Sequence, residues 1–414
     1  MRNLLSCFLL LIAMRSAAQQ QPGSLINRFG VNGSITNADK GSFNRIGVQP
    51  SGAIIVTRQS GIGEELLRYN ADGSQDLNFG PGRSEKGITH LRFMATGYNI
   101  DNLLIQPDGK IIVLGINQIS TGITSIFRLT QNGILDEKFG KGGRVTPDIL
   151  GLIVLKSIAL DVSGKIIVTG SYQIKPGEHT SLLMARFNAD GTPDFSFNRN
   201  GVRIVVETDG KNYSGEMCKV DGNSSITVLV TDGVDYFLKR YSPDGKIDPA
   251  FDTGGPVSHL HSLRFDVDVT GQVIYMLGGN CFILNANGKK VANYYIPTGT
   301  SVAQMRFQSN GKILFAGEKQ SSGATNFWME QLNSNGTPDL SFGQNGEVNT
   351  SFGTKSSISA VTIHDYQIYA TGYVQAAGQD WHGVIGVYQA SIPAQKPRIN
   401  NTELLQKVMK KSNR

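Results

Sequence analysis

The sequence predicts an all-β fold, a β-propeller built from four-stranded blades. Two observations carry this prediction. A block of the form Arg-x-x-x-Asp-Gly-x-x-Asp-x-x-Phe-Gly, or a variant of it, recurs at intervals of roughly 43 to 60 residues and alternates with a second block, Gly-Lys-Ile-Ile-Val-x-Gly. Internal repeats of this length are typical of propellers and solenoids. In addition, the repeat unit from Leu155 to Val206 contains no stretch of 11 to 18 residues with helical periodicity of its apolar residues.

Each block has an anchor residue that marks its copies along the chain. The aromatic anchors of the first block are Phe29, Phe79, Phe139, Phe197, Phe251, Tyr294 and Phe342. The turn glycines of the second block are Gly52, Gly109, Gly164, Gly222, Gly271 and Gly311, with a degenerate copy near Asp365. The 49 glycines of the chain agree with many tight turns, because Gly adopts positive φ without steric cost.

One repeat, from Leu155 to Val206, shows how the strands follow one another. Alternating or β-branched runs predict four strands in it, at Lys156–Asp161, Lys165–Gly170, Ser181–Phe187 and Val202–Val206. The Asn188–Gly191 segment between the last two is a strong turn signal. Radially arranged units of four short strands describe a β-propeller.

The two ends of the repeat region complement each other. The chain begins with the Phe block alone, at Gly23–Gly30, and ends with an Ile-rich strand and a further strand at Val384–Ala390 that no Phe block follows. Together they make one complete unit, as a ring requires when its N-terminal strand completes the last blade and removes a free edge. This predicts seven blades, or six if the short unit around residues 256–300 is not a blade.

Charged residues recur at fixed positions in the first block. An arginine precedes an aspartate by eight residues, and the Phe anchor follows, in the sets Arg68, Asp76, Phe79; Arg128, Asp136, Phe139; Arg186, Asp194, Phe197; and Arg240, Asp248, Phe251. A fifth set has Gln331 before Asp339 and Phe342, and in two degenerate units both members are apolar, Ile283 with Val291 and Val387 with Ile26. The arginine and the aspartate are lost together in the degenerate units, which predicts that they contact each other within each blade. Removing only one of them would leave the other charge without a partner. We interpret these positions as structural.

The repeat resembles the signature of a known family. Residues Asn188-Ala189-Asp190-Gly191-Thr192-Pro193-Asp194-Phe195-Ser196-Phe197, like residues 70–80 and 107–113, are similar to the delta-60 repeat, and the resemblance covers roughly residues 22–392. That resemblance implies a β-propeller of bacterial exported and surface proteins, with no general activity to carry over.

Composition divides the chain into three parts. Residues 1–18 are predicted to be a secretory signal peptide, residues 19–392 a single propeller domain, and residues 393–414 a basic tail. The net charge of +6 resides in the first and last parts. The propeller body therefore has no excess of positive charge of the kind that nucleic-acid binding requires. No later apolar run is long enough to span a membrane. We therefore expect an exported monomer, in the periplasm, on the cell surface or secreted.

Few residues outside the repeat suggest chemistry. Trp381 and His382 lie in or near a predicted inter-strand loop where an indole can stack on a sugar or anchor a protein partner. His259 and His261 share one face of a strand but have no evident third metal ligand. The Asn-x-Asp-Gly loops resemble calcium-binding loops, but an arginine stands where such a loop usually has its first carboxylate, and its positive charge would repel Ca²⁺. We therefore expect no metal and no cofactor. Cys218 and Cys281 form either one disulfide or two buried thiols.

Three functional hypotheses follow. The leading one is a non-enzymatic exported propeller that binds or displays a glycan or protein. The alternative is a carbohydrate- or peptide-processing enzyme with carboxylates at the channel mouth, for which the candidates are Asp101, Glu216, Asp266 and Asp268. The third is a purely structural module, which would expose an apolar patch or a free sheet edge.

Overall fold

Strands are the only regular secondary structure in the part of the chain that the structure describes. This computed structural model describes residues 20–391 except 61–62, 83–85, 92–97, 118–123, 199, 206–208, 260–262 and 377. The predicted signal peptide and the basic tail from Pro393 lie outside the described residues. Within these ranges no helix has the length and apolarity needed to cross a bilayer. The all-β prediction is confirmed.

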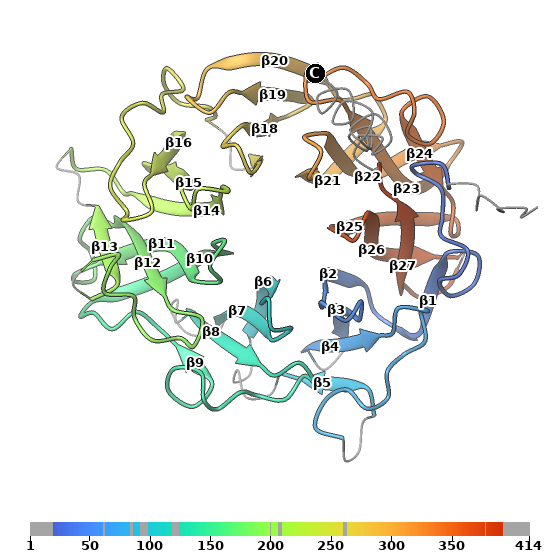
Figure 1. Cartoon of the computed structure of the whole chain (residues 1–414), viewed down its shortest axis with the longest axis horizontal. Helices are drawn as coiled ribbons and strands as arrows, with labels where there is room; N and C mark the ends of the chain where they lie inside the picture. The colour runs from blue at the N-terminus through green and yellow to red at the C-terminus, as the bar shows by residue number, and fades with distance from the viewer. Residues whose placement is uncertain are drawn as a thin grey trace, which may run out of the picture.

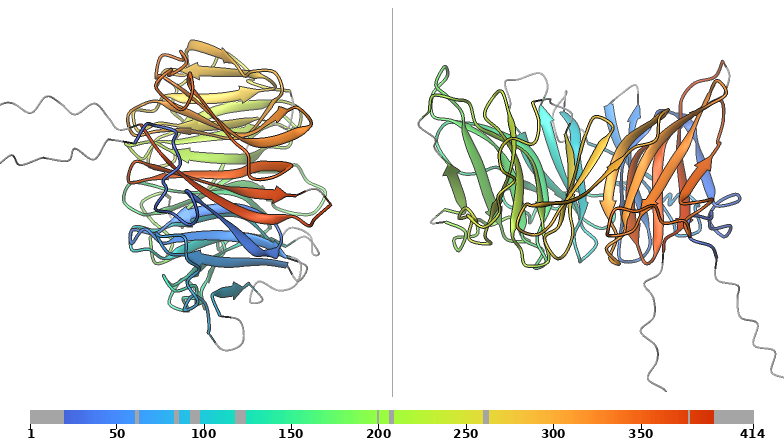
Figure 2. Two further views of the ribbon diagram at one scale, coloured as in Figure 1. Left: turned by 90° about the vertical axis from the view of Figure 1, so that its right-hand side faces the viewer. Right: turned by 90° about the horizontal axis from the view of Figure 1, so that it is seen from above.

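The strands form antiparallel sheets arranged in a ring around a central opening (Figure 1). Four sheets have four strands each: β2 (Phe43–Val48), β3 (Ile54–Ser60), β4 (Gly63–Tyr69) and β5 (Ile88–His90); β6 (Tyr98–Ile105), β7 (Ile111–Asn117), β8 (Thr124–Leu129) and β9 (Arg144–Val145); β10 (Leu152–Leu160), β11 (Ile166–Gln173), β12 (Ser181–Phe187) and β13 (Val202–Val205); and β17 (Arg264–Val267), β18 (Val273–Leu277), β19 (Asn280–Leu284) and β20 (Lys290–Tyr295). Seen from the side, the ring is a flattened body whose strands run between two loop-bearing faces (Figure 2).

One further sheet has three strands, β14 (Ser214–Val220), β15 (Ile226–Thr231) and β16 (Tyr236–Tyr241). Its outermost strand is reduced to a bridge between Tyr236 and Ser258, with the amide of Tyr236 donating to the carbonyl of Ser258 at 2.8 Å. The short unit around residues 256–300, in contrast, contains the complete four-stranded sheet β17–β20.

The last sheet has eight strands in two groups. The first group is β21 (Thr300–Phe307), β22 (Ile313–Ser321), β23 (Ala324–Leu332) and β24 (Glu347–Thr350), and the second is β25 (Lys355–His364), β26 (Gln367–Gln375), β27 (His382–Gln389) and β1 (Ser34–Lys40). The parallel pairing between the groups, β23 with β25, has Thr325 and Lys355 as its only registered partners. β1 pairs antiparallel with β27, and Leu25 bridges Tyr388.

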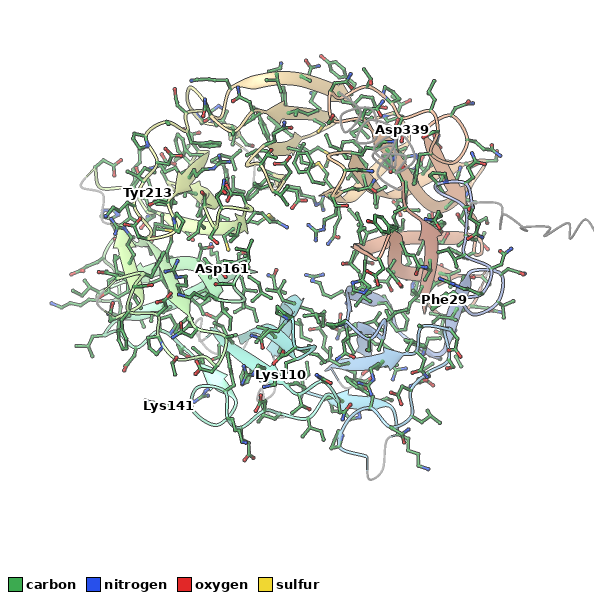
Figure 3. The ribbon with its side chains drawn as sticks, viewed as in Figure 1. Phe29, Lys110, Lys141, Asp161, Tyr213 and Asp339 are labelled. Atoms are coloured by element: carbon green, nitrogen blue, oxygen red, sulfur yellow. The ribbon has the colours of Figure 1, made fainter. Side chains whose placement is uncertain are left out.

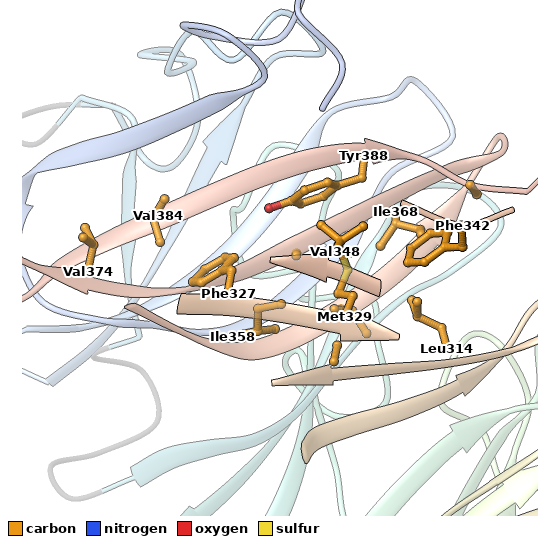
Figure 4. Close-up of a cluster of buried hydrophobic side chains, with 14 residues drawn as sticks. Leu314, Phe327, Met329, Phe342, Val348, Ile358, Ile368, Val374, Val384 and Tyr388 are labelled. Atoms are coloured by element: carbon orange, nitrogen blue, oxygen red, sulfur yellow. The ribbon is translucent and has the colours of Figure 1, made fainter. Parts of the chain in front are cut away.

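The hydrophobic core is divided among clusters that lie between neighbouring sheets. Figure 4 shows one such cluster, in which Phe327 and Met329 from β23 meet Ile368 from β26 and Tyr388 from β27. Phe342, one of the aromatic anchors, belongs to the same cluster and is fully buried. Each Phe anchor therefore acts as a packing element between blades, as expected for a large apolar side chain at a repeated position.

The glycine of the Asp-Gly turn is required by the Phe anchor of the preceding blade. A Cβ on Gly191 (φ +86°) would lie 2.8 Å from the ring of Phe139, and one on Gly133 would lie 2.4 Å from the ring of Phe79. The residue that follows each anchor also connects blades, since the amide of Gly80 donates to the carbonyl of Asn132 at 2.8 Å.

The charged repeat positions form compact clusters at the same place. Arg68 pairs with Asp76 at 2.7 Å, Arg128 with Asp136 at 3.0 Å and Arg186 with Asp194 at 2.7 Å. Each arginine also lies over its own Phe anchor, at 5.0, 4.6 and 4.9 Å from the ring centroid. The lysine of the Gly-Lys block adds a second partner to the aspartate in three blades: Lys110 with Asp136, Lys165 with Asp194 and Lys312 with Asp339.

The fourth set corrects the sequence prediction. Arg240 lies 4.3 Å from the ring centroid of Phe251 but forms no ion pair with Asp248 among the described side chains. Its guanidinium instead donates to the carbonyls of Ala286 and Gly271, each at 2.6 Å. This blade has Ser225 where other blades carry the Gly-Lys lysine, so Asp248 lacks both of the cations that bind its equivalents.

The two cysteines are separate buried thiols. Cys218 and Cys281 are unpaired and belong to different core clusters. Burial raises the pKa of both, that of Cys281 to about 12. Of the two alternatives left open by the sequence, the disulfide is excluded.

Candidate functional site

The inner strands of the ring surround a central channel, lined by side chains from β2, β6, β10, β14, β17, β21 and β25. Its volume is about 630 Å³, enough for a small ligand with bound water. Asp161, in the turn after β10, lies beside this centre, whereas the anchor Phe29 lies near the outer edge (Figure 3). The anchor Phe29 is thus remote from the channel wall, whereas Asp161 of the Gly-Lys block lies beside the centre.

β-bulges shape the channel wall. Six of the inner strands shift register against their neighbour by one residue, at or before the middle of the strand. The skipped residues are Asn44, Asp101, Lys156, Glu216, Ala303 and Ser359. A bulge re-aims the side chain of its extra residue, and Lys156, Glu216 and Ser359 are among those that line the channel. The bulges in β10, β14, β21 and β25 thus present four different side chains to the channel, those of Lys156, Glu216, Ala303 and Ser359.

The charges on the channel wall are mostly basic. Its described lining holds the five cations Arg45, Lys156, Lys219, Arg264 and Arg306 but only the two carboxylates Glu216 and Asp266. Lys156 binds Glu216 at 2.5 Å, while Asp266 is shared by Lys219 at 3.2 Å and Arg306 at 3.7 Å. Sequence analysis missed this basic lining, because the residues come from different repeats and share no motif.

Of the four carboxylates predicted at the channel mouth, the structure places two on the channel wall. Glu216 and Asp266 both line the channel and are both held by cations. Asp268 does not line it, because its carboxylate accepts the amides of Thr270 and Gln272 and so shapes a turn. The side chain of Asp101 lies outside the described residues.

A second hollow, of about 570 Å³, lies where the β26–β27 loop meets the β1–β2 link. This Trp381 hollow is lined by Lys40, Gly41, Ser42, Gln59, Ser60, Tyr373, Asp380 and Trp381. The Trp381 ring is 39% exposed and packs edge-on against Tyr373, with 4.8 Å between ring centroids. Lys40 and Asp380 form an exposed 2.6 Å ion pair at the rim.

The predicted histidine sites do not assemble. The Nδ1 atom of His382 lies 3.0 Å from the carbonyl oxygen of Asn37, which ties that imidazole to β1 rather than to the Trp381 hollow. His259 is exposed and pairs with Asp235, whereas His261 lies outside the described residues. Among the described side chains, no three His, Cys, Asp or Glu residues gather as metal ligands would.

Comparison with protein families identifies the repeat. Residues 163–197 and 308–342 match the family described as a domain of unknown function (DUF5122) beta-propeller. Each segment runs from the turn of the Gly-Lys block through the Phe anchor, so the matched unit is the repeat itself. The chain carries β-propeller repeats. No curated protein matches this sequence.

Solved structures show similarity at low identity. A prolyl oligopeptidase B from Galerina marginata is 10% identical, with a TM-score of 0.50, and the match covers 85% of this chain and 52% of that one. A protein of unknown function from Dyadobacter fermentans is 11% identical with a TM-score of 0.42, covering 90% and 98% of the two chains. Another from Bacteroides caccae is 10% identical with a TM-score of 0.38, covering 75% and 99%. The match to the oligopeptidase, at 10% identity, shows similarity of fold alone.

Proposed function

We propose that the protein is an exported, non-enzymatic propeller that binds a glycan against the Trp381 hollow. The observation that carries this proposal is the fixed, partly exposed indole beside polar groups. Tyr373 braces the Trp381 ring, which reduces the ordering cost of binding, and the ring face can stack on the apolar face of a sugar. Ser42, Gln59 and Asp380 supply hydrogen-bonding groups around it.

The proposed ring has seven blades. We count the two groups of the eight-stranded sheet as separate blades, because their pairing has a single registered partner pair. β1 would then complete the last blade, in support of which the amide of Ile26 donates to the carbonyl of Val387 at 2.8 Å. Asp76 makes the equivalent bond to Arg68 in its own blade, at 2.9 Å. The Trp381 hollow lies where this closing blade meets β3.

Catalysis by channel carboxylates remains the second candidate. Glu216 and Asp266 do line one channel, but each is neutralised by a neighbouring cation. A general acid needs a proton and a nucleophile needs access, and ion pairing hinders both. The binding role therefore has the better support.

A glycan and peptide array tests the proposal. The protein is expected to bind a subset of glycans, and Trp381→Ala should weaken this binding about fivefold or more, since loss of a stacked ring costs on the order of 1–3 kcal/mol. Phe195→Ala, which removes another exposed aromatic ring far from the hollow, is the matched control. Binding that survives Trp381→Ala rejects the hollow, and binding to peptides alone rejects the glycan.

Export has its own test. Cell fractionation should recover the protein outside the cytoplasm. N-terminal sequencing of the recovered protein should find residue 19 as its first residue. Recovery of the intact N-terminus in the cytoplasm would contradict the export proposal.

A further inference from the structure

Three neighbouring inner strands bring three cations and one carboxylate to the channel wall. Arg264 and Asp266 lie two residues apart on β17, Lys219 lies on the preceding inner strand β14, and Arg306 lies on the following one, β21. We name these four residues the channel cluster. Its charge is not balanced, because it contains three cations and a single carboxylate, which pairs with only two of them.

Both carboxylate oxygens of Asp266 already have partners. One oxygen of Asp266 lies 3.2 Å from Lys219 and 3.7 Å from Arg306, and the other accepts the amide of Phe307 at 2.9 Å. Sharing one negative charge between two cations leaves positive potential at that place. The amide of Phe307 also holds the Asp266 carboxylate in this position, and its described ion-pair partners are Lys219 and Arg306 rather than Arg264.

Arg264 has no carboxylate partner among the described side chains. Its guanidinium donates to the carbonyl of Val302 on β21 at 2.7 Å, which holds the side chain toward the strand that carries Arg306. Partial removal from water lowers the pKa of Arg264, and no neighbouring anion offsets this. A guanidinium has five N–H donors, so one carbonyl leaves most of them available.

The positive charges of Lys219 and Arg306 repel each other. Burial, and next the positive charge of Arg306, lower the pKa of Lys219, although Asp266 acts in the opposite direction. Both side chains remain accessible from the channel, with exposed fractions of 24% and 31%. A second negative charge placed here would relieve the repulsion without displacing any hydrogen bond of Asp266.

We propose that the channel cluster binds a small polyvalent anion through its carboxylate or phosphate oxygens. Arg264 and Arg306 would each donate paired N–H groups to oxyanion oxygens, the geometry for which guanidinium groups are suited, while Lys219 contributes a point charge. This site is independent of the Trp381 hollow, which belongs to other strands, so failure of one does not affect the other.

Isothermal titration calorimetry on the purified full chain tests this site, with pyrophosphate and citrate as separate probes. Binding of pyrophosphate alone would mean that the site takes phosphates, and binding of citrate alone would mean that it takes carboxylates. Either result, or binding of both probes, supports the proposal. Binding should weaken as salt is raised, because an anion held by partly accessible cations is screened. Absence of binding by either probe at low salt overturns it.

Variants locate the site. Arg264→Gln and Arg306→Gln are each expected to weaken binding about tenfold or more, whereas Arg144→Gln, on the exposed outer strand β9, should leave it unchanged. Asp266→Asn keeps an acceptor for Phe307 but removes the competing charge, so it should tighten binding severalfold. A damaged fold would not tighten binding, which separates the proposal from misfolding. Equal affinity in the wild type and Arg264→Gln overturns the assignment.

Discussion

Arg68 donates a 2.7 Å hydrogen bond from its guanidinium to the main-chain carbonyl of Gln131, which belongs to the next blade around the ring. The same link recurs from Arg128 to Ala189, from Arg186 to Pro243 and from Arg240 to Ala286. The repeated arginine therefore joins blades as well as pairing inside one. This explains why Arg240 is kept although it makes no ion pair with Asp248.

Loss of the aspartate should have different effects in two equivalent blades. Asp194→Asn leaves Arg186 and Lys165 without a counter-charge at a site where the carboxylate is 7% exposed. We expect it to lower the free energy of unfolding by about 3 kcal/mol. Asp248→Asn, at the position without ion pairs, should cost less than about 1 kcal/mol. Urea denaturation measures both, and equal losses would contradict the assigned role of the ion pair.

Acid should destabilise the protein through the same aspartates. Burial opposes ionisation of Asp194, but hydrogen bonds from Lys165, Ser196 and Arg186 outweigh it and lower the pKa; Asp136 and Asp339 show the same direction of shift. Because these folded-state pKa values lie below the unfolded value of about 3.9, the unfolded state binds more protons in acid. The stabilisation is therefore complete above about pH 5 and is lost as the pH falls toward the folded values.

Melting temperatures measured between pH 7 and pH 2 check this expectation. The curve should be flat near neutrality and fall below about pH 4. Asp194→Asn should fall less steeply, because one of the responsible carboxylates is gone. An identical slope in both proteins would mean that other groups cause the acid sensitivity.

Glycines at positive φ should differ in their tolerance of alanine. Gly191 and Gly177 have φ of +86° and +88°, but only at Gly191 would a Cβ meet neighbours, 2.7 Å from Val145 and 2.8 Å from Phe139. Gly177→Ala is expected to cost about 1 kcal/mol from the backbone alone. Gly191→Ala should cost about 2 kcal/mol more because it also overpacks the core. Chemical denaturation measures the difference, and similar losses would show that the core yields to the extra methyl.

The degenerate turn at Asp365 offers a stabilising change. Asp365 and Tyr366 have φ of +45° and +59° in the two-residue turn between β25 and β26, a geometry that favours glycine. Tyr366→Gly should raise the free energy of unfolding by about 1 kcal/mol. Tyr366→Ala removes the same ring but keeps the strained backbone, so it should give no gain. An equal gain from both would point to the ring instead.

The scaffold could be predicted because its residues repeat. Phe139, Gly191 and the arginine-aspartate pairs recur at matching positions, and a contact that recurs leaves a pattern that one sequence can show. The short unit with Val291 and Tyr294 was the doubtful one, yet it forms the full sheet β17–β20. Even without the charged pair, Ile283 is fully buried in the core there, so packing alone maintains that sheet.

The candidate sites were harder to predict, for a physical reason. Trp381 could be selected because an exposed tryptophan is rare, but its neighbours Lys40 and Gln59 come from segments far apart in sequence. Of the channel cluster, the sequence indicated only Asp266, and it gave no signal for the three cations. Lys219 and Arg306 stand at the same position of their repeats, but Arg264 stands two residues earlier in its own repeat, so the three cations form no repeated motif. Only closure of the ring brings them together.

The sequence by itself determined the strands, the turns and the order of the repeats, since these depend on local periodicity, on glycine at positive φ and on contacts within one unit. The tertiary structure decided which side chains meet across units. It let the repeated arginines donate hydrogen bonds to the neighbouring blade, left Asp248 without a cation and brought the channel cluster together. Local rules act over a few residues, whereas the charge of the channel depends on strands that only the complete ring brings face to face.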